Sequence, residues 1–243
     1  MAESPSPSAA AAAGAQAQRA VEQRTAPVSA LGVAVKFGTG GIGFDLATPL
    51  ANRVNLRGGV SLLSTGTTFN TDGLDINGSL DLRTAAVSVD FFPFHNSFRL
   101  SPGITVYNNT HLFATVAVPG GQTFTLNDVM YTSSPNDPVH GTGSLRFGNK
   151  VAPRFTTGFG NIVPRGSKRF SFPVEAGFQY ISNPTVSLSL TGSACSTEGC
   201  GSFSSDASAQ SNLTAQQKLL TDALSPLRFF PIVSVGFSYK FGR

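Results

Sequence analysis

Charged side chains and long apolar runs are both scarce in this sequence. Asp, Glu, Lys and Arg make up 12% of the 243 residues, about half the share of an average globular protein. The mean hydropathy is +0.05, yet no run of about 18 apolar residues is present, which excludes a transmembrane helix. Strands that alternate apolar and polar residues produce this combination, because the average conceals one apolar and one polar face.

The sequence also lacks the marks of a cofactor, metal or nucleic-acid site. The net charge of +4 comes without a Lys/Arg cluster, so it does not indicate nucleic-acid binding. His95, His111 and His140 are not at metal-ligand spacing, and no serine, histidine and acid lie close together. No Gly-x-Gly pair opens a helix after a strand, as a phosphate loop requires. We therefore predict no catalytic residue, no cofactor and no metal.

What the sequence does contain is regular alternation, clearest over residues 229–241. The odd positions of this stretch are apolar or aromatic, and the even positions from 234 onward are Ser, Gly, Ser and Lys. A period of two predicts a β-strand with one apolar and one polar face. The aromatic residues at its end, Phe237, Tyr239 and Phe241, are typical of a strand that ends at a membrane–water interface.

This last strand resembles the C-terminal assembly signal of bacterial outer-membrane β-barrels, carried here by Ser234, Gly236, Tyr239 and Phe241. The alternation from residue 31 to 241 is similar to that of small barrels of the OmpA/OmpW-like type. The resemblance implies a bacterial outer-membrane location, insertion by the barrel-assembly machinery, contact with outer-membrane lipid and lipopolysaccharide, and a monomer. In an exported protein, Cys195 and Cys200 are expected to form a disulfide, with free thiols as the alternative.

Turn signals divide the alternating segments into about eight strands. The short turns fall on one side of the predicted sheet, at 49–53, 93–97 and 161–168. The other connections fall on the opposite side, at 38–41, 70–75, 110–145 and 193–227. This count treats residues 170–190 as one long strand, and a hairpin at 183–184 is the rival interpretation. We predict an all-β fold, a closed antiparallel transmembrane β-barrel of about eight strands, with ten as the alternative if part of 110–145 joins the wall.

Two regions of the chain are expected to differ from the barrel wall. Residues 1–30 are rich in Ala, Ser, Pro and Gln and nearly free of large apolar side chains, which predicts disorder. Residues 31–243 are the barrel domain, with long loops at 110–145 and 193–227. In the second loop, apolar residues at 213, 219, 220 and 224 predict a short amphipathic helix over 213–224, before the last strand.

The predicted inward faces carry few charges, and their signs are mixed. These residues are Lys36, Asp45, Arg57, Asp81, Arg83, Asp90, Arg99, Arg154, Glu175 and Lys240. Charges inside a narrow barrel are costly to desolvate unless they pair, and an eight-strand interior is just wide enough for side chains to fill. We expect a packed ion-pair network in place of an open pore. Asp81 and Arg83 lie beside a slip of the alternation near Ala85.

Fold alone does not specify function. We expect a structural or surface-interaction role, with a side-chain-filled lumen and without enzymatic activity. One alternative is a lipid-modifying enzyme at the outer leaflet, for which His111 with Asp128 or Asp137 is the candidate site. A second is a narrow channel for small solutes, and a third is a soluble secreted β-protein.

Overall fold

Eight antiparallel strands close into a ring. The computed structural model describes residues 28–242 apart from 72–73, 95–96 and 149. Each strand pairs with its neighbours, and the last strand pairs with the first over the register Leu31↔Phe241 to Gly38↔Ser234. The strands, in ring order, are β1 (Leu31–Gly38), β2 (Gly41–Ala51), β3 (Val54–Thr71), β4 (Leu74–Phe91), β5 (Phe98–Asn108), β10 (Ala152–Phe159), β12 (Val174–Tyr180) and β16 (Phe229–Phe241). The predicted all-β, closed eight-strand barrel is confirmed, and the ten-strand alternative is wrong.

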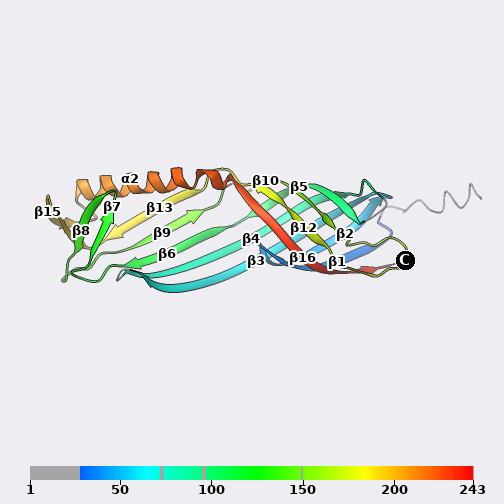
Figure 1. Ribbon diagram of the computed structural model, residues 1–243, viewed down its shortest axis with the longest axis horizontal. Coiled ribbons are helices and arrows are strands. Elements are labelled where there is room, and N and C mark those ends of the chain that lie inside the picture. Colours follow the sequence, from blue (N-terminus) through cyan, green and yellow to red (C-terminus); the bar gives the residue numbers. More distant parts are fainter. Residues whose placement is uncertain (1–27, 72–73, 95–96, 149, 243) are drawn as a thin grey trace, which may run out of the picture.

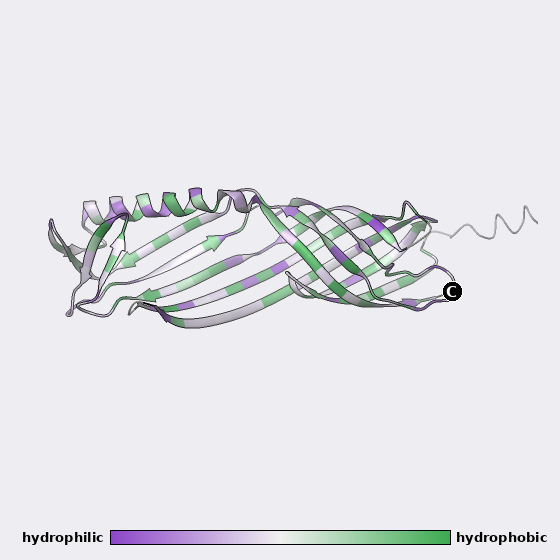
Figure 2. Cartoon of the chain, in the orientation of Figure 1, coloured by the Kyte–Doolittle hydropathy of each residue, from purple (hydrophilic) through white to green (hydrophobic). Residues whose placement is uncertain are grey.

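The two faces of the barrel wall differ as the alternation predicts. Along β16 the odd side chains point outward, and Phe229, Val235 and Phe237 are 55%, 54% and 45% exposed. The even side chain Ser238 points inward and is fully buried. Apolar and polar residues therefore alternate along the strands of the barrel (Figure 2). The result is an apolar outer surface around a polar interior.

Five strands continue beyond the barrel as a sheet, which we call the extension (Figure 1). The long strands β3 and β4 run into it unbroken, and the other three members resume strands of the barrel. These are β6 (His111–Ala117), β9 (His140–Arg146) and β13 (Thr185–Thr191). The pairing order in the extension is β13-β9-β6-β4-β3.

The structure corrects the prediction of one long strand over residues 170–190. β12 ends at Tyr180 and β13 begins at Thr185, and Ser182 between them has a φ of 64°. The rival hairpin at 183–184 is absent from this described stretch, because β12 pairs with β10 while β13 pairs with β9, so the chain keeps its direction. The break reverses which residues face inward: Glu175 and Gln179 are buried in β12, whereas Leu188 and Leu190 pack on the core above the barrel.

The slip of the alternation near Ala85 does not interrupt the pairing of β4 with β3, although the register of β4 against β5 shifts between Ala85 and Ala86. β4 pairs with β3 in one unbroken register from Val54↔Phe91 to Thr71↔Leu74. Even residues such as Leu82 and Asp90 stay buried inside, while odd residues stay outside. The outward residues of β4 are apolar at Val87 and Val89 and charged at Asp81 and Arg83. The polarity of the outer face therefore reverses along the strand while its side chains keep alternating.

A small second domain covers the far end of the extension; we call it the cap. It contains a four-strand sheet and two helices: β7 (Thr123–Leu126), β8 (Val129–Ser133), β14 (Ser193–Ser196), β15 (Gly199–Ser202), α2 (Ala207–Ala223) and the 3-10 helix η1 (Ser225–Arg228). Phe124, Tyr131, Phe203 and Leu213 pack in its core. The stretches expected to be long loops therefore hold regular structure.

The cap resolves two further predictions. A helix does precede the last strand, but α2 is longer than the predicted 213–224 because Asp206 caps its N-terminus by accepting a hydrogen bond from the Ala209 N–H at 3.0 Å. Its first turns are small and polar, so they carry no apolar period. The predicted disulfide is confirmed: Cys195 and Cys200 are bonded across the β14–β15 hairpin. Neither described helix is long and apolar enough to cross a membrane.

The start of the chain is only partly covered by the structure. Of residues 1–30, expected to be disordered, 1–27 lie outside the described residues. Residues 28–30 are hydrogen-bonded to β2, where the Val28 N–H donates to the Pro49 carbonyl at 2.9 Å. The Thr48 hydroxyl also donates to the Ala30 carbonyl at 3.0 Å. The described part of the chain thus begins at the end of the barrel opposite the extension.

Candidate functional site in the barrel lumen

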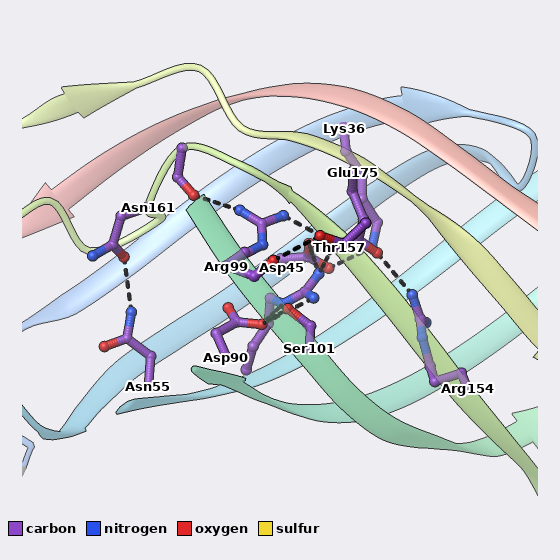
Figure 3. A network of polar contacts seen from close by, with 12 residues as sticks. Lys36, Asp45, Asn55, Asp90, Arg99, Ser101, Arg154, Thr157, Asn161 and Glu175 are labelled. Carbon is purple, nitrogen blue, oxygen red and sulfur yellow. Dashed lines mark hydrogen bonds and ion pairs between the residues drawn. The ribbon is translucent and has the colours of Figure 1, made fainter. Parts of the chain in front are cut away.

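Glu175 is the centre of a buried ion network inside the barrel (Figure 3). Its carboxylate accepts hydrogen bonds from Arg57 Nη1 at 2.6 Å, Arg99 Nη2 at 3.0 Å and Arg154 Nη2 at 3.0 Å. The Arg57, Arg99 and Glu175 side chains are each at most 3% exposed. Charges removed from water to this degree are stabilised only by close partners, so the four side chains must act as one unit.

Two aspartates extend this network toward the neighbouring strands. Arg57 Nε donates to Asp90 Oδ1 at 3.1 Å, and its Nη1 lies 3.4 Å from Asp45 Oδ2. Lys36 Nζ donates to the other oxygen of Asp45 at 2.6 Å. The Ser101 hydroxyl donates to Asp90 at 2.7 Å. The network joins four cations, Lys36, Arg57, Arg99 and Arg154, to three carboxylates, Asp45, Asp90 and Glu175.

A small residue makes room for these large side chains. Gly59 follows Arg57 at the next inward position of β3, and it pairs with Asp45 on β2. A Cβ atom at Gly59 would lie 1.9 Å from Asp45 Oδ1. Any larger residue there would therefore displace the carboxylate that Lys36 and Arg57 share.

The lumen is also closed below the network, at the end away from the extension. The connection between β10 and β12 folds inward, and Ile162 and Val163 pack against Ala34 and Ala47 of the wall. Ile162 is 1% exposed. The Asn55 amide donates to Asn161 Oδ1 at 2.8 Å, which ties this connection to β3. We call this inward-folded connection the lower plug.

Above the network, toward the extension, the lumen opens into a pocket with a cavity volume of about 50 Å³. Lys36 and Arg154 of the network line it, as do Gln179 and the β1–β2 turn at residues 38–41. Because the turn forms part of the barrel rim, the pocket reaches the outside. Its remaining wall combines the apolar side chains of Leu82, Phe147, Ile181, Phe230, Ile232 and Val233 with the polar ones of Ser61, Thr84, Asn108, Thr110 and Ser234. We call it the upper pocket.

Two of the residues predicted to face the lumen lie on the outer wall, and a third, Lys240, lies in the lumen but outside the network. Asp81 and Arg83 are on the outer wall, 3.7 Å apart, and the Arg83 side chain is 56% exposed. They were assigned inward because polar residues of a membrane strand usually face the lumen, but here β4 has left the apolar band. Lys240 is buried near the lower plug, where its Nζ donates to the Gly166 carbonyl at 2.7 Å. It belongs to the opposite end of the lumen from Lys36.

The histidine candidate also has a different partner. His111 Nε2 lies 3.6 Å from Asp81 Oδ2, and not beside Asp128 or Asp137. Asp137 accepts a hydrogen bond from the Ser193 hydroxyl in the cap. His140 bonds to the Pro138 carbonyl, and His95 lies outside the described residues.

The four residues of the suggested assembly signal lie on β16 as the alternation requires. Ser234 and Gly236 face inward; Ser234 lines the upper pocket, and a Cβ at Gly236 would lie 2.7 Å from the Val35 carbonyl oxygen. Tyr239 and Phe241 face outward with ring centroids 4.7 Å apart. Phe170 of the short strand β11 (Phe170–Ser171) packs on Tyr239 at 5.1 Å. An aromatic cluster therefore borders the lower end of the wall.

Sequence reasoning missed the parts of the lumen that do not carry charge. Gln179 Oε1 accepts from the buried Thr105 hydroxyl at 2.6 Å, and both are inward positions of alternating strands, so the period of two could have found them. Ile162 and Val163 gave no such signal, since they lie in a connection that the sequence marks only as a turn.

Comparison with known proteins supports the fold. No protein-family model matches the chain, and no curated protein matches it. Among solved structures, the chain is similar to Acinetobacter baumannii CarO, with 21% identity, a TM-score of 0.57 and coverage of 89% of this chain and 98% of that one. It is also similar to Acinetobacter baumannii CarO2, with 19% identity, a TM-score of 0.60 and coverage of 89% and 100%. The likeness supports a small barrel of the outer-membrane type and does not single out the OmpA/OmpW-like type.

Proposed function

We propose that this protein is an integral barrel of the bacterial outer membrane with a closed lumen, and that the barrel anchors the extension and the cap at the cell surface. The observation that carries the proposal is the Glu175 network, which fills the lumen with paired, buried side chains. The role is structural or surface-interacting and is not enzymatic. The partners are outer-membrane lipid and lipopolysaccharide, with the barrel-assembly machinery acting during insertion of a monomer.

The outer surface of the wall supports the membrane placement. Large apolar residues surround the barrel at outward positions of neighbouring strands, among them Phe44, Leu62, Ile104, Phe155 and Val233. Such a surface is unfavourable in water and stable in lipid, where a closed sheet also satisfies every backbone polar group. Both chain ends of the barrel lie at its far end from the extension (Figure 1), as expected for termini on the periplasmic side.

The extension offers a surface for interaction outside the membrane. Its outward face carries a polar row that crosses all five strands, formed by directly paired residues: Thr68, Asn77, Thr115, Thr142 and Ser189. Short polar side chains on a flat sheet suit hydrogen bonding to water or to a polar partner. The opposite face is the apolar one that packs under the cap through Leu188 and Leu190.

The arrangement around His111 argues against the lipid-modifying enzyme. Ser64 pairs with Asp81 on one side, and His111 pairs with Asp81 on the other. A nucleophilic triad requires the histidine between the serine and the acid, whereas here the acid lies in the middle. Among the described residues, no serine hydroxyl is hydrogen-bonded to His111.

Two measurements test the proposal. Refolded protein is run on SDS gels with and without boiling, and a closed barrel is expected to migrate faster before boiling. The same preparation is then incorporated into planar bilayers, where no stable conductance steps are expected. A mobility shift accompanied by regular conductance steps would favour the narrow channel. No mobility shift, with solubility in plain buffer, would favour the soluble secreted protein.

A further inference from the structure

We propose that the upper pocket is a binding site for a small amphipathic carboxylate, with the carboxylate on Lys36 and Arg154 and the apolar body against the pocket wall. This inference goes beyond the proposed function, although it rests on the same ion network as the floor of the pocket. Apolar walls with a few convergent polar groups are typical of small-molecule sites.

Three polar side chains of the pocket present donors to it, those of Lys36, Arg154 and Gln179. Lys36 and Arg154 both line it. Gln179 Oε1 is occupied by the Thr105 hydroxyl, so its amide N–H groups are left to face the pocket. An ammonium, a guanidinium and an amide that converge in this way select for an acceptor, and best for an anion.

Arg154 has a hydrogen-bonding group to spare. Its Nη2 donates to Glu175, but its Nε–H is buried and has no partner among the described residues. The side chain is only 9% exposed. A buried N–H without an acceptor carries the full cost of its desolvation, and a carboxylate oxygen in the pocket would remove that cost.

The charges of the network do not balance. Lys36, Arg57, Arg99 and Arg154 contribute four positive charges, and Asp45, Asp90 and Glu175 contribute three negative ones, which leaves an excess of one positive charge. Uncompensated charge is expensive inside a protein. Lys36 and Arg154 are the network cations that line the upper pocket, so a single carboxylate bound there would neutralise the network.

The walls of the pocket define the rest of the ligand. Leu82, Ile181, Phe230 and Ile232 face one another around the upper lumen. Phe230 and Ile232 are inward residues in the upper half of β16. The inward residues in the lower half of the same strand include the polar Ser238 and Lys240. The apolar inward residues thus coincide with the pocket, and they suit a short acyl chain attached to the carboxylate.

The test uses butyrate, its neutral amide and butylamine as probes. Binding to the full-length protein in lipid nanodiscs is measured by saturation-transfer NMR and calorimetry, with empty nanodiscs as the blank. We expect saturable binding of the carboxylate and no binding of the amine. The amide should bind more weakly than the carboxylate by more than about tenfold, which is the cost of one charge-assisted hydrogen bond. Equal affinities for the three probes, or no saturable binding of the carboxylate at millimolar concentrations, would overturn the proposal.

Variants locate the site. Arg154→Gln removes the excess charge and leaves three cations with three carboxylates, so the barrel is expected to fold while the carboxylate affinity falls by more than about tenfold. Lys36→Gln is a second variant of the same kind. Arg83→Gln removes an equal charge from the outer wall and is the matched control. Unchanged affinity in both lumen variants would refute the site. This assay does not measure conductance, so an absence of carboxylate binding would not contradict the closed-lumen proposal. Conductance in planar bilayers would likewise not contradict the binding result.

Discussion

Glu175 and Arg57 connect opposite walls of the barrel. Glu175 Oε2 accepts from Arg57 Nη1 at 2.6 Å, and their strands, β12 and β3, are separated by three strands in either direction around the ring. Backbone pairing fixes each strand only against its two neighbours. A direct contact across the ring connects opposite walls, so this pair braces the narrow bore that the eight strands set.

Removal of the shared carboxylate should therefore be costly. We expect Glu175→Gln to lower the free energy of unfolding by about 3–5 kcal/mol, because it leaves buried guanidinium groups without their common anion. The measurement is urea unfolding in lipid vesicles, followed by circular dichroism. Glu198→Gln at the exposed β14–β15 turn is the control and should change stability by less than about 0.5 kcal/mol. Equal unfolding midpoints for the two variants would contradict the role given to Glu175.

The network and the lower plug are two barriers in series, so either one alone should keep the lumen closed. We expect no conductance steps from Arg57→Ala with Glu175→Ala, and none from Ile162→Ala with Val163→Ala. The quadruple variant should conduct in planar bilayers. Asp81→Ala with Arg83→Ala, a charge pair on the outer wall, is the control for the loss of an ion pair. Conductance from either double variant at the level of the quadruple variant would show that only one barrier exists.

Alternation alone located most of the lumen. A period of two places Lys36, Asp45, Arg57, Arg99 and Glu175 on inward faces, and the narrow bore of an eight-strand barrel then makes their pairing unavoidable. Which carboxylate meets which cation could not be derived in this way. That depends on the stagger of the strands around the ring, and stagger is set by the sum of all the registers.

The same reasoning gave the wrong face for Asp81 and Arg83, because a polar residue indicates contact with water or with polar groups. It does not indicate whether the side chain lies inside or outside the barrel. In the membrane placement proposed above, outward side chains are apolar within the bilayer. Above it, the outward face meets water and the inward face packs under the cap, so the pattern inverts while the strand stays regular. The inward fold of Ile162 and Val163 was also beyond prediction, since a connection has no period that reveals which of its side chains are buried.

The inversion along β4 gives a direct test of where the membrane ends. Val87 and Ser79 are both outward residues of this strand, on either side of the change in polarity. Val87→Lys should destabilise the barrel in lipid vesicles by about 2–4 kcal/mol, the cost of a cation on the lipid face. Ser79→Lys should cost less than about 1 kcal/mol, as at a water-facing or interfacial site. Similar losses for both lysines, measured by urea titration, would place the boundary elsewhere.

Two aromatic residues of the last strand allow the effect of a substitution on stability to be separated from its effect on assembly. Phe237 and Phe241 are both outward aromatic residues of β16, 45% and 51% exposed, so truncation of either to alanine removes a comparable lipid contact. We expect similar unfolding midpoints for Phe237→Ala and Phe241→Ala after refolding into vesicles. In a Gram-negative host, however, Phe241→Ala should reduce the heat-modifiable protein in the outer membrane several-fold more than Phe237→Ala does, because we propose that Phe241 belongs to a signal that the assembly machinery reads in the unfolded chain. Equal amounts of the two variants in the membrane would show that β16 acts only as a strand of the wall.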